Sequence, residues 1–409
     1  MRILFVAETA SIHAAKWINQ LRNTGWELHV FQGVVPGYGV SPEFKCGTLY
    51  LPCPVTVPQG VASQRTLPSN VLICKASSRI ASLKRLLQTG HVLYLARLIN
   101  QLKPDVIHSL GLNVNWNNMC KPVLQARRIL GEKFKTPWVY SSWGTDLDYY
   151  ACQSAEHRAH AEAVLKACDY HITECKRDAR LAQEMGFQGE LAGFFPAFGG
   201  VALEDLRALR RAGPVSSRRT IFLKGRDQTA GGDPVGRAMT AMKAFALCQD
   251  ILSGYQIVIG QASQSVVAEA AVLSATTNLK IQVLPYLPYS ALLGIMGASR
   301  LLLALTINDG LPNTLVEAIS LGAFPIHSDL EPIREWIKDG ENGLLVPAED
   351  PQAVADALRR ALTDDELVDR AAEKNARIVQ ERLTDTVVRP KVIEMYERVA
   401  RQGPVLPRN

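Results

Sequence analysis

Residues 301–326 read LLLALTINDGLPNTLVEAISLGAFPI and predict one β-α-β unit. The first run, Leu301–Thr306, is unbroken and apolar, which is typical of a strand buried on both faces of a parallel sheet. Pro312 suits the first position of a helix and Gly322 the residue just past its end, before a second apolar run. The loop between strand and helix therefore lies where open α/β sheets bind ligands and where a helix N-terminus attracts anions.

Two carboxylates mark this loop and the helix after it. Asp309 lies in the loop, and Glu317 lies inside the helix on the same face as Asn313 and Thr314. A carboxylate accepts several hydrogen bonds, so it suits the paired hydroxyl groups of a ribose or a hexose. The alternative from these residues alone is a helix cap at Asp309 and a solvated Glu317.

The stretch resembles the donor-binding segment of family-four retaining glycosyltransferases, which have the two-Rossmann GT-B fold. That family has a Glu, seven residues, a second Glu and a Gly-containing turn, matched here by Asp309, Glu317 and Gly322. The resemblance implies that Glu317 holds the donor ribose, and that Asp309, shorter than a Glu by about 1.5 Å, lies near the sugar. Further implied donor contacts are Gly310, Leu311, Asn313 and Thr314 to the diphosphate and sugar, and Leu284 to the nucleotide base.

Another strand is expected earlier in the chain, at residues 220–223, and the loop after it carries Lys224 and Arg226. In the family, an Arg at this place and a Lys a few residues later bind the diphosphate. The resemblance places Arg226 at that Arg, whereas Gly231 stands at the Lys position, so we expect Lys224 or Arg237 to supply the missing charge. Each charge-assisted hydrogen bond to phosphate contributes about 1.5–3 kcal/mol, so these cations dominate the expected donor contacts.

The first half of the chain opens with a similar unit, a strand over Met1–Ala7 and a helix over Ala14–Asn23. In the family, loops after such strands contact the acceptor. The acceptor-side residues implied by the resemblance are Ser11, His13, His108, Trp143 and Asp146. Trp143 stands where relatives have a His, and an indole offers one donor and no acceptor, so we expect it to stack on a sugar face. For His13, a capping or packing role is an equal alternative.

The composition is that of a chain with two α/β domains. Of its 409 residues 47% are hydrophobic and 21% charged, and no apolar run is long enough to span a bilayer. We expect an acceptor-binding Rossmann-like domain over 1–204, facing across a cleft a nucleotide-sugar-binding one over 205–385, and a final helix over 386–409 that crosses back. The eight cysteines show no metal-ligand spacing and the chain starts directly on a strand, so a cytoplasmic protein with reduced thiols is expected.

Positive charge is concentrated in the first half of the chain. Residues 65–135 contain 12 Lys and Arg against 2 Asp and Glu. The pattern over Val71–Leu102 predicts helix, broken near Gly90, in which basic residues alternate with leucines. Such a helix contacts an anionic membrane surface or forms a solvated face over the core, and the residues favour the two equally. Nucleic acid is disfavoured, because no binding motif or aromatic platform accompanies the charge.

The sequence as a whole predicts a retaining transferase of a hexose-type sugar from a UDP- or GDP-type donor to a glycan, lipid-linked or small-molecule acceptor. Its location would be the cytoplasm or the inner face of the cytoplasmic membrane. Asp309, Arg226 and Lys224 are the expected catalytic residues, and neither a metal nor a cofactor is expected, since the Asp-x-Asp at Asp146 belongs to a different fold's metal site. The alternatives are a sugar-nucleotide epimerase or hydrolase of the same fold, or a non-catalytic binding partner.

Overall fold

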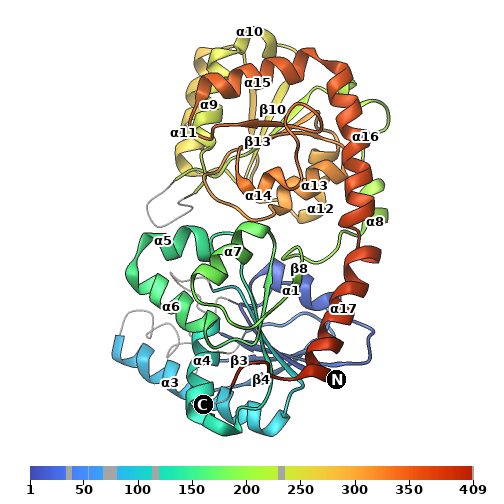
Figure 1. Ribbon diagram of the computed structural model, residues 1–409. Helices are drawn as coiled ribbons and strands as arrows, with labels where there is room; N and C mark the ends of the chain where they lie inside the picture. Colours follow the sequence, from blue (N-terminus) through green and yellow to red (C-terminus); the bar gives the residue numbers. More distant parts are fainter. Residues whose placement is uncertain (34–38, 54, 68–80, 113–118, 229–234, 408–409) are drawn as a thin grey trace. The chain divides into compact units, whose positions relative to one another are not determined.

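The computed structural model describes residues 1–33, 39–53, 55–67, 81–112, 119–228 and 235–407 (Figure 1). The chain folds into two compact units. The N-terminal unit comprises Met1–Gly200 and Asp385–Asn409, and the C-terminal unit comprises Val201–Thr384. The sequence placed these boundaries at 204/205 and 385/386.

The N-terminal unit is built on a parallel sheet of eight strands in the order β4-β3-β2-β1-β5-β6-β7-β8. The strands are β1 (Arg2–Ala7), β2 (Glu27–Gln32), β3 (Thr48–Leu51), β4 (Ala62–Arg65), β5 (Val106–Leu110), β6 (Trp138–Ser141), β7 (Tyr170–Thr173) and β8 (Glu190–Phe194). Alternate residues of β1 enter different hydrophobic clusters: Ile3 and Phe5 on one face, Leu4 and Val6 on the other. Both faces of the sheet are therefore buried, which explains why the central strands are unbroken apolar runs.

Helices cover this sheet on its two faces (Figure 1). They are α1 (Ile12–Asn19), α3 (Ala81–Leu102), α4 (Cys120–Leu130), α5 (Ala151–Gln153), α6 (Ala155–Leu165), α7 (Lys176–Glu184) and α17 (Asp385–Gln402), with a π-helical turn at Asp146–Tyr150 and a 3-10 turn at Gly131–Lys133. The final helix α17 inserts Val388, Val392 and Tyr396 into the same cluster as Phe5. It thus crosses back onto the first sheet, as the sequence predicted.

The C-terminal unit has a parallel sheet of six strands in the order β11-β10-β9-β12-β13-β14. The strands are β9 (Thr220–Lys224), β10 (Gln256–Gly260), β11 (Lys280–Val283), β12 (Leu301–Ala304), β13 (Phe324–Ser328) and β14 (Leu344–Val346). The helices are α8 (Leu203–Arg207), α9 (Ala238–Leu247), α10 (Gln249–Leu252), α11 (Gln264–Thr276), α12 (Tyr289–Gly297), α13 (Asn313–Ser320), α14 (Glu331–Arg334), α15 (Pro351–Thr363) and α16 (Asp365–Arg382), with a 3-10 turn at Val215–Ser217.

The β-α-β unit predicted from residues 301–326 is present as β12, α13 and β13, with β12 and β13 paired in parallel. Gly322 has φ +89°, the left-handed conformation that suits the residue past a helix end. Pro312 differs from the prediction by one position. It is extended, with φ −65° and ψ 127°, and therefore precedes the helix as its cap instead of starting it.

Two further expectations from the sequence are wrong. The predicted break near Gly90 is absent, because α3 continues through that residue to Leu102; the part of the predicted helix before Ala81 lies outside the described residues. A Cβ at position 90 would lie 3.2 Å from a methyl group of Leu67, so the glycine permits a close approach to the helix. Cys53 is disulfide-bonded, whereas the sequence predicted only reduced thiols.

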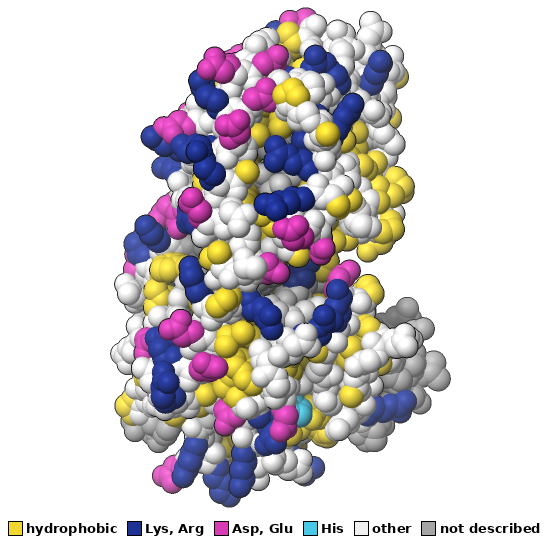
Figure 2. All heavy atoms as spheres, turned by 90° about the vertical axis from the view of Figure 1, so that its right-hand side faces the viewer, with side chains coloured by type: hydrophobic (Ala, Val, Ile, Leu, Met, Phe, Trp, Pro, Cys, Tyr) yellow, Lys and Arg dark blue, Asp and Glu magenta, His cyan; other side chains and the backbone are white. Residues whose placement is uncertain are grey.

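The α/β fold with two Rossmann-like units is confirmed. Within the described part of the chain, no helix has the length and apolar character needed to cross a membrane. In the view of Figure 2, basic and acidic side chains are interspersed over the visible surface of each unit.

Candidate active site

Three segments of the C-terminal unit meet at the carboxyl ends of β9 and β12. The N–H of Arg237 donates to the carbonyl of Leu305 at 3.0 Å, and the N–H of Ile307 donates back to Val235 at 2.9 Å. The N–H of Ala238 donates to the carbonyl of Arg226 at 3.1 Å. The start of α9 is thereby fixed between the loop after β9 and the loop after β12. The structure therefore brings the predicted diphosphate-binding residues to one edge of the sheet.

A charged pair lies at the centre of this edge. The ammonium of Lys224 is 3.7 Å from a carboxylate oxygen of Asp309, and the other oxygen of Asp309 accepts the N–H of Gly310 at 3.0 Å. Both side chains are half-buried. The pair joins two residues that the sequence predicted to be catalytic, although they come from different loops. The positive charge of Lys224 offsets the negative charge of Asp309 while the two are in contact.

Arg237 and Arg226 expose their side chains to very different extents. Arg237 is only 13% exposed; it donates to the carbonyl of Gly236 at 2.8 Å and pairs with Glu349 at 2.7 Å. Glu349 is 68% exposed, so an anion that reached Arg237 could displace it at little cost in buried contacts. The side chain of Arg226 is exposed. Gly231, the position where the family has a Lys, lies outside the described residues.

Glu317 lies on α13, half-buried, and is held by a residue that the sequence did not single out. The hydroxyl of Tyr289, at the start of α12, donates to a carboxylate oxygen of Glu317 at 2.5 Å. This contact joins α12 to α13 and fixes the orientation of the carboxylate. Of the other predicted donor residues, Gly310 and Leu311 are buried, while Asn313, Thr314 and Leu284 are partly buried. Leu284 follows β11 directly, and its N–H donates to Ile259.

His327, in β13, is a second residue of this edge that sequence reasoning missed. It is fully buried, and burial lowers its pKa to about 4; the nearby Asp309 raises that pKa and Lys224 lowers it. His327 is therefore neutral at physiological pH and adds no charge beneath the Lys224–Asp309 pair. The only signal in the sequence is a histidine inside an otherwise apolar strand, which a satisfied core histidine would also produce.

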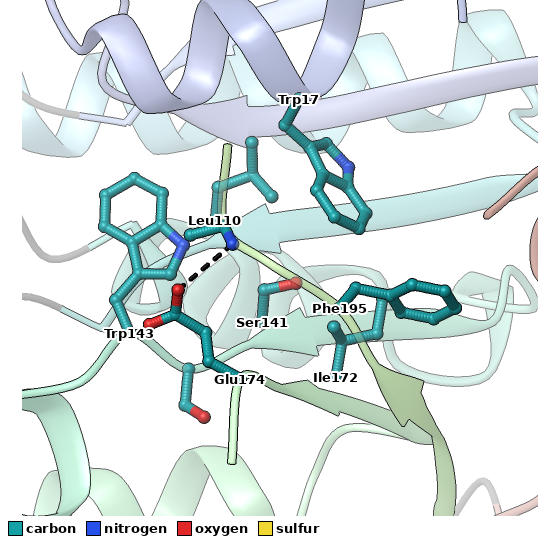
Figure 3. Close-up of a pocket in the computed structure, with 9 residues that line it drawn as sticks. Trp17, Leu110, Ser141, Trp143, Ile172, Glu174 and Phe195 are labelled. Carbon is teal, nitrogen blue, oxygen red and sulfur yellow. Dashed lines mark hydrogen bonds between the residues drawn. The ribbon is translucent and has the colours of Figure 1, made fainter. Parts of the chain in front are cut away.

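The N-terminal unit has a pocket at the carboxyl ends of β5 to β8 (Figure 3). Its lining residues are Trp17, Leu110, Ser141, Ser142, Trp143, Ile172, Glu174, Phe195 and Ala197. Trp17 comes from α1 and the others from the ends of strands or the loops that follow them. Figure 3 shows Trp143 and Glu174 on one side of the pocket and Trp17 and Phe195 on the other. Its position is the one at which open α/β sheets bind ligands.

Trp143 is packed between two segments that the sequence also placed near an acceptor. Its ring meets the ring of His13 edge-on, with centroids 5.9 Å apart and planes at 72°. Its other neighbour is Gly111, where a Cβ would lie 3.1 Å from the indole; the φ of +80° there also favours glycine. Ser11 caps α1 by accepting the N–H of Ala14. The structure thus brings Trp143 and His13 together, with Ser11 at the start of the same helix.

Sequence reasoning predicted only Trp143 among the residues that line the pocket, and Glu174 is the charged one that it missed. It is buried directly after β7, and its carboxylate accepts the N–H of Ala197 at 3.1 Å, the bond drawn in Figure 3. An acidic residue directly after the expected strand at Tyr170–Thr173 is the one signal that could have found it. A buried carboxylate beside an indole can accept a hydrogen bond from a ligand hydroxyl whose carbon skeleton packs on the ring.

His108 and Asp146 do not face the pocket in the way the sequence led us to expect. His108 has no exposed surface, and its two ring nitrogens lie 2.6 Å from the hydroxyl of Tyr396 and 2.7 Å from that of Ser141. Asp146 is buried and accepts the N–H groups of Leu112 and Trp143 at 2.7 and 3.0 Å. Both residues therefore hold other parts of the unit in place, and this geometry gives no support to a direct acceptor contact.

The second aspartate of the Asp-x-Asp sequence, Asp148, pairs with Arg177 at 2.9 Å, and Arg177 also donates to the carbonyl of Gly144. The two aspartates thus take part in holding the loop that carries Trp143. Among the residues that the structure describes, no group of three His, Cys, Asp or Glu side chains could hold a metal ion.

Residues 237–378 match the family described as glycosyl transferases group 1. This segment is similar to the domain that defines that family. It begins at Arg237 and contains Asp309, Glu317 and the whole of the β12-α13-β13 unit. The family match and the geometry of the C-terminal unit therefore concern the same residues.

Curated relatives match a shorter stretch. A phosphatidyl-myo-inositol mannosyltransferase of Mycobacterium leprae is 42% identical over 89 residues, which is 22% of this chain and 24% of the relative. The Mycolicibacterium smegmatis protein of the same description is 37% identical over 93 residues, 22% of this chain and 23% of its own length. The match thus spans about a quarter of the length of these relatives.

Solved structures are similar over nearly the whole chain. Sucrose-phosphate synthase from Thermosynechococcus elongatus gives a TM-score of 0.70 at 15% identity, covering 98% of this chain and 99% of its own. An α,α-trehalose-phosphate synthase from Burkholderia vietnamiensis gives 0.68 at 14% identity, covering 98% and 100%. HepE from Anabaena, solved with UDP and glucose, gives 0.64 at 13% identity, covering 97% and 100%. At such identities the similarity shows the fold, which is that of GT-B glycosyltransferases.

Proposed function

We propose that this protein is a retaining glycosyltransferase that moves a hexose-type sugar from a nucleotide-diphosphate donor to an acceptor hydroxyl. The observation that carries the proposal is the meeting of Lys224, Arg226 and Arg237 with the loop before α13, at the edge of the group 1 domain. Cations from separate loops, next to a helix N-terminus, suit a diphosphate. HepE, of the same fold, was solved with UDP and glucose, which supports a nucleotide donor of the UDP type.

The donor half of the site divides its work among these residues. Arg226 and Arg237 would bind the diphosphate, and Lys224 would stabilise the charge that develops on it as the bond to the sugar breaks. Asp309, released from Lys224 as the phosphate arrives, would accept hydrogen bonds from the sugar. Glu317, already oriented by Tyr289, would accept both ribose hydroxyls. Leu284 would lie against the nucleotide base.

The proposed reaction needs no protein nucleophile. The bond between the anomeric carbon and the diphosphate oxygen breaks, and the acceptor oxygen bonds to that carbon from the same face. The acceptor's proton passes to the departing diphosphate. Because the acceptor attacks from the face that the diphosphate leaves, the anomeric configuration is retained. The positive charge that favours departure comes from Lys224, Arg226 and Arg237, and this is our reason for proposing a metal-independent reaction.

The acceptor would bind at the pocket of the N-terminal unit. Trp143 offers a ring face for the C–H surface of a sugar or cyclitol, and Glu174 a buried acceptor for one of its hydroxyls. A pocket walled by aromatic rings and lined by one carboxylate favours a neutral polyol group over an anionic one. The relatives' description as phosphatidyl-myo-inositol mannosyltransferases fits such a group, since inositol is a polyol.

We further propose that this transferase is peripheral on an anionic membrane surface through α3 and α4. The helix α3 exposes Leu86 and Leu93 to 68% and 43%, next to exposed Lys84, Arg85 and Arg97. Exposed leucines flanked by basic side chains are the features of a helix that lies on a charged bilayer. On α4, Ile129 is 52% exposed beside Arg128, which extends the same pattern. A lipid-linked acceptor would then be within reach, as in the biosynthesis of lipid-linked glycans and polysaccharides.

The test follows release of nucleoside diphosphate from UDP-glucose and from GDP-mannose. Each donor is incubated with the protein alone, with methyl glucosides, with hexose 6-phosphates and with phosphatidylinositol vesicles, each with and without EDTA. Acceptor-dependent release that survives EDTA, and a product whose anomeric configuration NMR shows to be retained, are expected. Release without any acceptor would indicate a hydrolase, a changed sugar nucleotide an epimerase, and binding without release a non-catalytic partner.

A further inference from the structure

Two walls of the pocket in the N-terminal unit are tied to one hydroxyl group on the final helix. The indole nitrogen of Trp17 lies 2.9 Å from the hydroxyl oxygen of Tyr396, in α17. His108 Nδ1 lies 2.6 Å from that same oxygen, and His108 Nε2 lies 2.7 Å from the hydroxyl of Ser141. Trp17 and Ser141 both line the pocket. All four side chains are buried, so solvent does not compete for these bonds.

The hydrogens in this chain of bonds can be ordered in one way. An indole N–H only donates, so the oxygen of Tyr396 accepts from Trp17 and must give its own hydrogen elsewhere. Among the described residues, its other hydrogen-bond partner is His108, so the Tyr396 hydroxyl donates to Nδ1. His108 then carries its hydrogen on Nε2 and donates it to Ser141. The opposite tautomer would leave the Tyr396 hydrogen buried and unpaired.

This order is stable at physiological pH. Burial lowers the pKa of His108 to about 3, so the ring stays neutral and keeps one hydrogen. The groups packed around it are the uncharged rings of Phe5, Trp17 and Tyr396, at centroid distances of 5.7 to 5.8 Å. The four groups therefore form a fixed series, in which the Tyr396 hydroxyl accepts from Trp17 and donates to His108.

Loss of that hydroxyl would act on the pocket from both sides. Trp17 would lose the acceptor of its indole N–H, and its ring contacts Phe195, another pocket wall, at 6.1 Å between centroids. His108 would lose the hydroxyl that donates to its Nδ1, and its hydrogen would be free to move from Nε2 to Nδ1. Ser141 would then face an acceptor nitrogen in place of a donor, and its hydroxyl hydrogen would change direction.

We propose that Tyr396 is a positioning residue for the acceptor, which acts through Trp17 on one wall of the pocket and through His108 and Ser141 on the other. The final helix thereby sets the shape of the acceptor pocket. This inference rests on the proposed function, because it takes the pocket to be the acceptor site. The role is one of geometry, since Tyr396 itself is fully buried and does not line the pocket.

The test compares Tyr396→Phe with a matched control, Tyr170→Phe. Tyr170, in β7, also uses its hydroxyl to hold the end of the chain, donating to the carbonyl of Gly403 at 2.8 Å, but it does not line the pocket. With GDP-mannose or UDP-glucose and the acceptor from the panel above that gives turnover, Tyr396→Phe should raise the acceptor KM about tenfold and leave the donor KM within about twofold. Tyr170→Phe should leave both unchanged. Equal changes in the two variants, or an unchanged acceptor KM in Tyr396→Phe, would overturn the proposal.

A double-mutant cycle tests the connection to the far wall. Ser141→Ala and Tyr396→Phe act through the same histidine, so their effects on acceptor KM should be less than multiplicative. Ser142→Ala is the control: it removes the neighbouring hydroxyl of the pocket, which bonds to His171 and not to His108. The effects of Ser142→Ala and Tyr396→Phe on acceptor KM should therefore multiply. If the effects of Ser141→Ala and Tyr396→Phe on acceptor KM multiply fully, the proposal is contradicted.

An NMR measurement needs no substrate and separates this inference from the proposed function. In protein labelled with 15N at the histidine rings and the indoles, His108 should show hydrogen on Nε2 only. Tyr396→Phe should change the His108 nitrogen shifts and the indole signals of Trp17 and Trp143, whereas Tyr170→Phe should not. A His108 hydrogen on Nδ1, or an unmoved Trp143 signal, overturns the positioning role. Absence of turnover in the unmodified protein with every acceptor would overturn the proposed function alone.

Discussion

The carboxyl edges of the two sheets occupy equivalent places in similar folds, yet they differ in chemistry. The edge of the C-terminal unit carries charged side chains, among them the Lys224–Asp309 and Arg237–Glu349 pairs. The edge of the N-terminal unit is walled by Trp17, Trp143 and Phe195, and the histidine beneath it is neutral. Parallel β-α-β topology fixes where a ligand can bind, whereas the loop residues decide which ligand binds.

This difference also separates the units by their response to acid. In the N-terminal unit, burial lowers the pKa of five histidines: to about 3 for His108 and His171, to about 4 for His91 and His160, and by a smaller amount for His29. In the C-terminal unit the same holds for His327, at about 4. Asp178 acts in the opposite direction, because burial raises its pKa to about 6. When the four strongly shifted histidines are counted against Asp178, the N-terminal unit binds a net three more protons in its unfolded state than in its folded state over this pH range.

The largest expected effect is acid destabilisation of the N-terminal unit. A buried histidine with a lowered pKa stabilises the folded state fully above its unfolded pKa of about 6.5 and loses that contribution as the pH falls below it. Between about pH 6.5 and 4.5 the N-terminal unit should lose about 4 kcal/mol per pH unit, against about 1.4 for the C-terminal unit. Hydrogen exchange followed by mass spectrometry at pH 7 and pH 5 measures both units in the intact chain.

A pair of variants sharpens this test. His171→Asn should flatten the pH dependence of the N-terminal unit by about 1.4 kcal/mol per pH unit, and His327→Asn that of the C-terminal unit by the same amount. Each should leave the other unit unchanged. If the two units open together at pH 5, or the C-terminal unit opens first, the contrast between them is wrong.

The next largest effect is expected at Glu317. Glu317→Ala should lower kcat/KM for the donor about a hundredfold, because a carboxylate that accepts both ribose hydroxyls loses two charge-assisted bonds. Tyr289→Phe keeps the carboxylate but removes the bond that orients it, so a smaller loss of about fivefold is expected. Steady-state kinetics with UDP-glucose and GDP-mannose measure both. Unchanged kinetics in a folded Glu317→Ala protein would remove this residue from the site.

A thirtyfold effect is expected at the arginines. Arg226→Ala and Arg237→Ala should each weaken binding of nucleoside diphosphate by about 2 kcal/mol, or roughly thirtyfold, through loss of one phosphate contact. Glu349→Gln serves as the control. It removes the negative charge that pairs with Arg237 and leaves the positive charge of Arg237 in place, so it should not weaken binding. Calorimetric titration with UDP and GDP measures all three. Normal binding by both arginine variants would show that the diphosphate lies elsewhere.

The smallest expected effect concerns the membrane. Replacing Lys84 and Arg85 by Ser should reduce binding to acidic vesicles about tenfold at low salt, and the difference should shrink as salt shortens the screening length to about 8 Å. The control replaces Lys391 and Arg401 on α17, where positive and negative side chains are interspersed (Figure 2). Co-sedimentation with neutral and acidic vesicles measures the effect. Equal binding to both vesicle types would favour a solvated surface.

The fold could be predicted from the sequence because parallel strands that are buried on both faces, such as Leu301–Ala304, leave a run of apolar residues. Helix boundaries depended on weaker signals. A glycine ordinarily weakens a helix, but Gly90 continues α3 because Leu67, distant in the sequence, packs against it. Such a reason is tertiary, and no local pattern contains it.

The site residues divide in the same way. Arg226 lies in a short motif after β9, and Asp309 and Glu317 lie in another after β12, so the resemblance gave their positions. Arg237 was expected as a substitute for the Lys that Gly231 replaces. Backbone bonds join the loops that carry Arg226, Arg237 and Asp309. Glu174, Tyr289 and His327 are single residues whose importance comes only from what they contact. His108 and Asp146 were recognised by motif, but their side chains turn into the interior, where their polar atoms bind neighbouring groups instead of a ligand.

The return of α17 to the first sheet has a consequence for how the protein forms during synthesis. The core of the N-terminal unit includes Val388, Val392 and Tyr396, which the ribosome adds only after residues 201–384 are complete. The C-terminal unit is continuous in the chain and can fold as it emerges, whereas the N-terminal unit, made first, must wait for the last helix to close its core. Until then the sheet surface that Tyr396 later covers stays open to chaperones and to proteases.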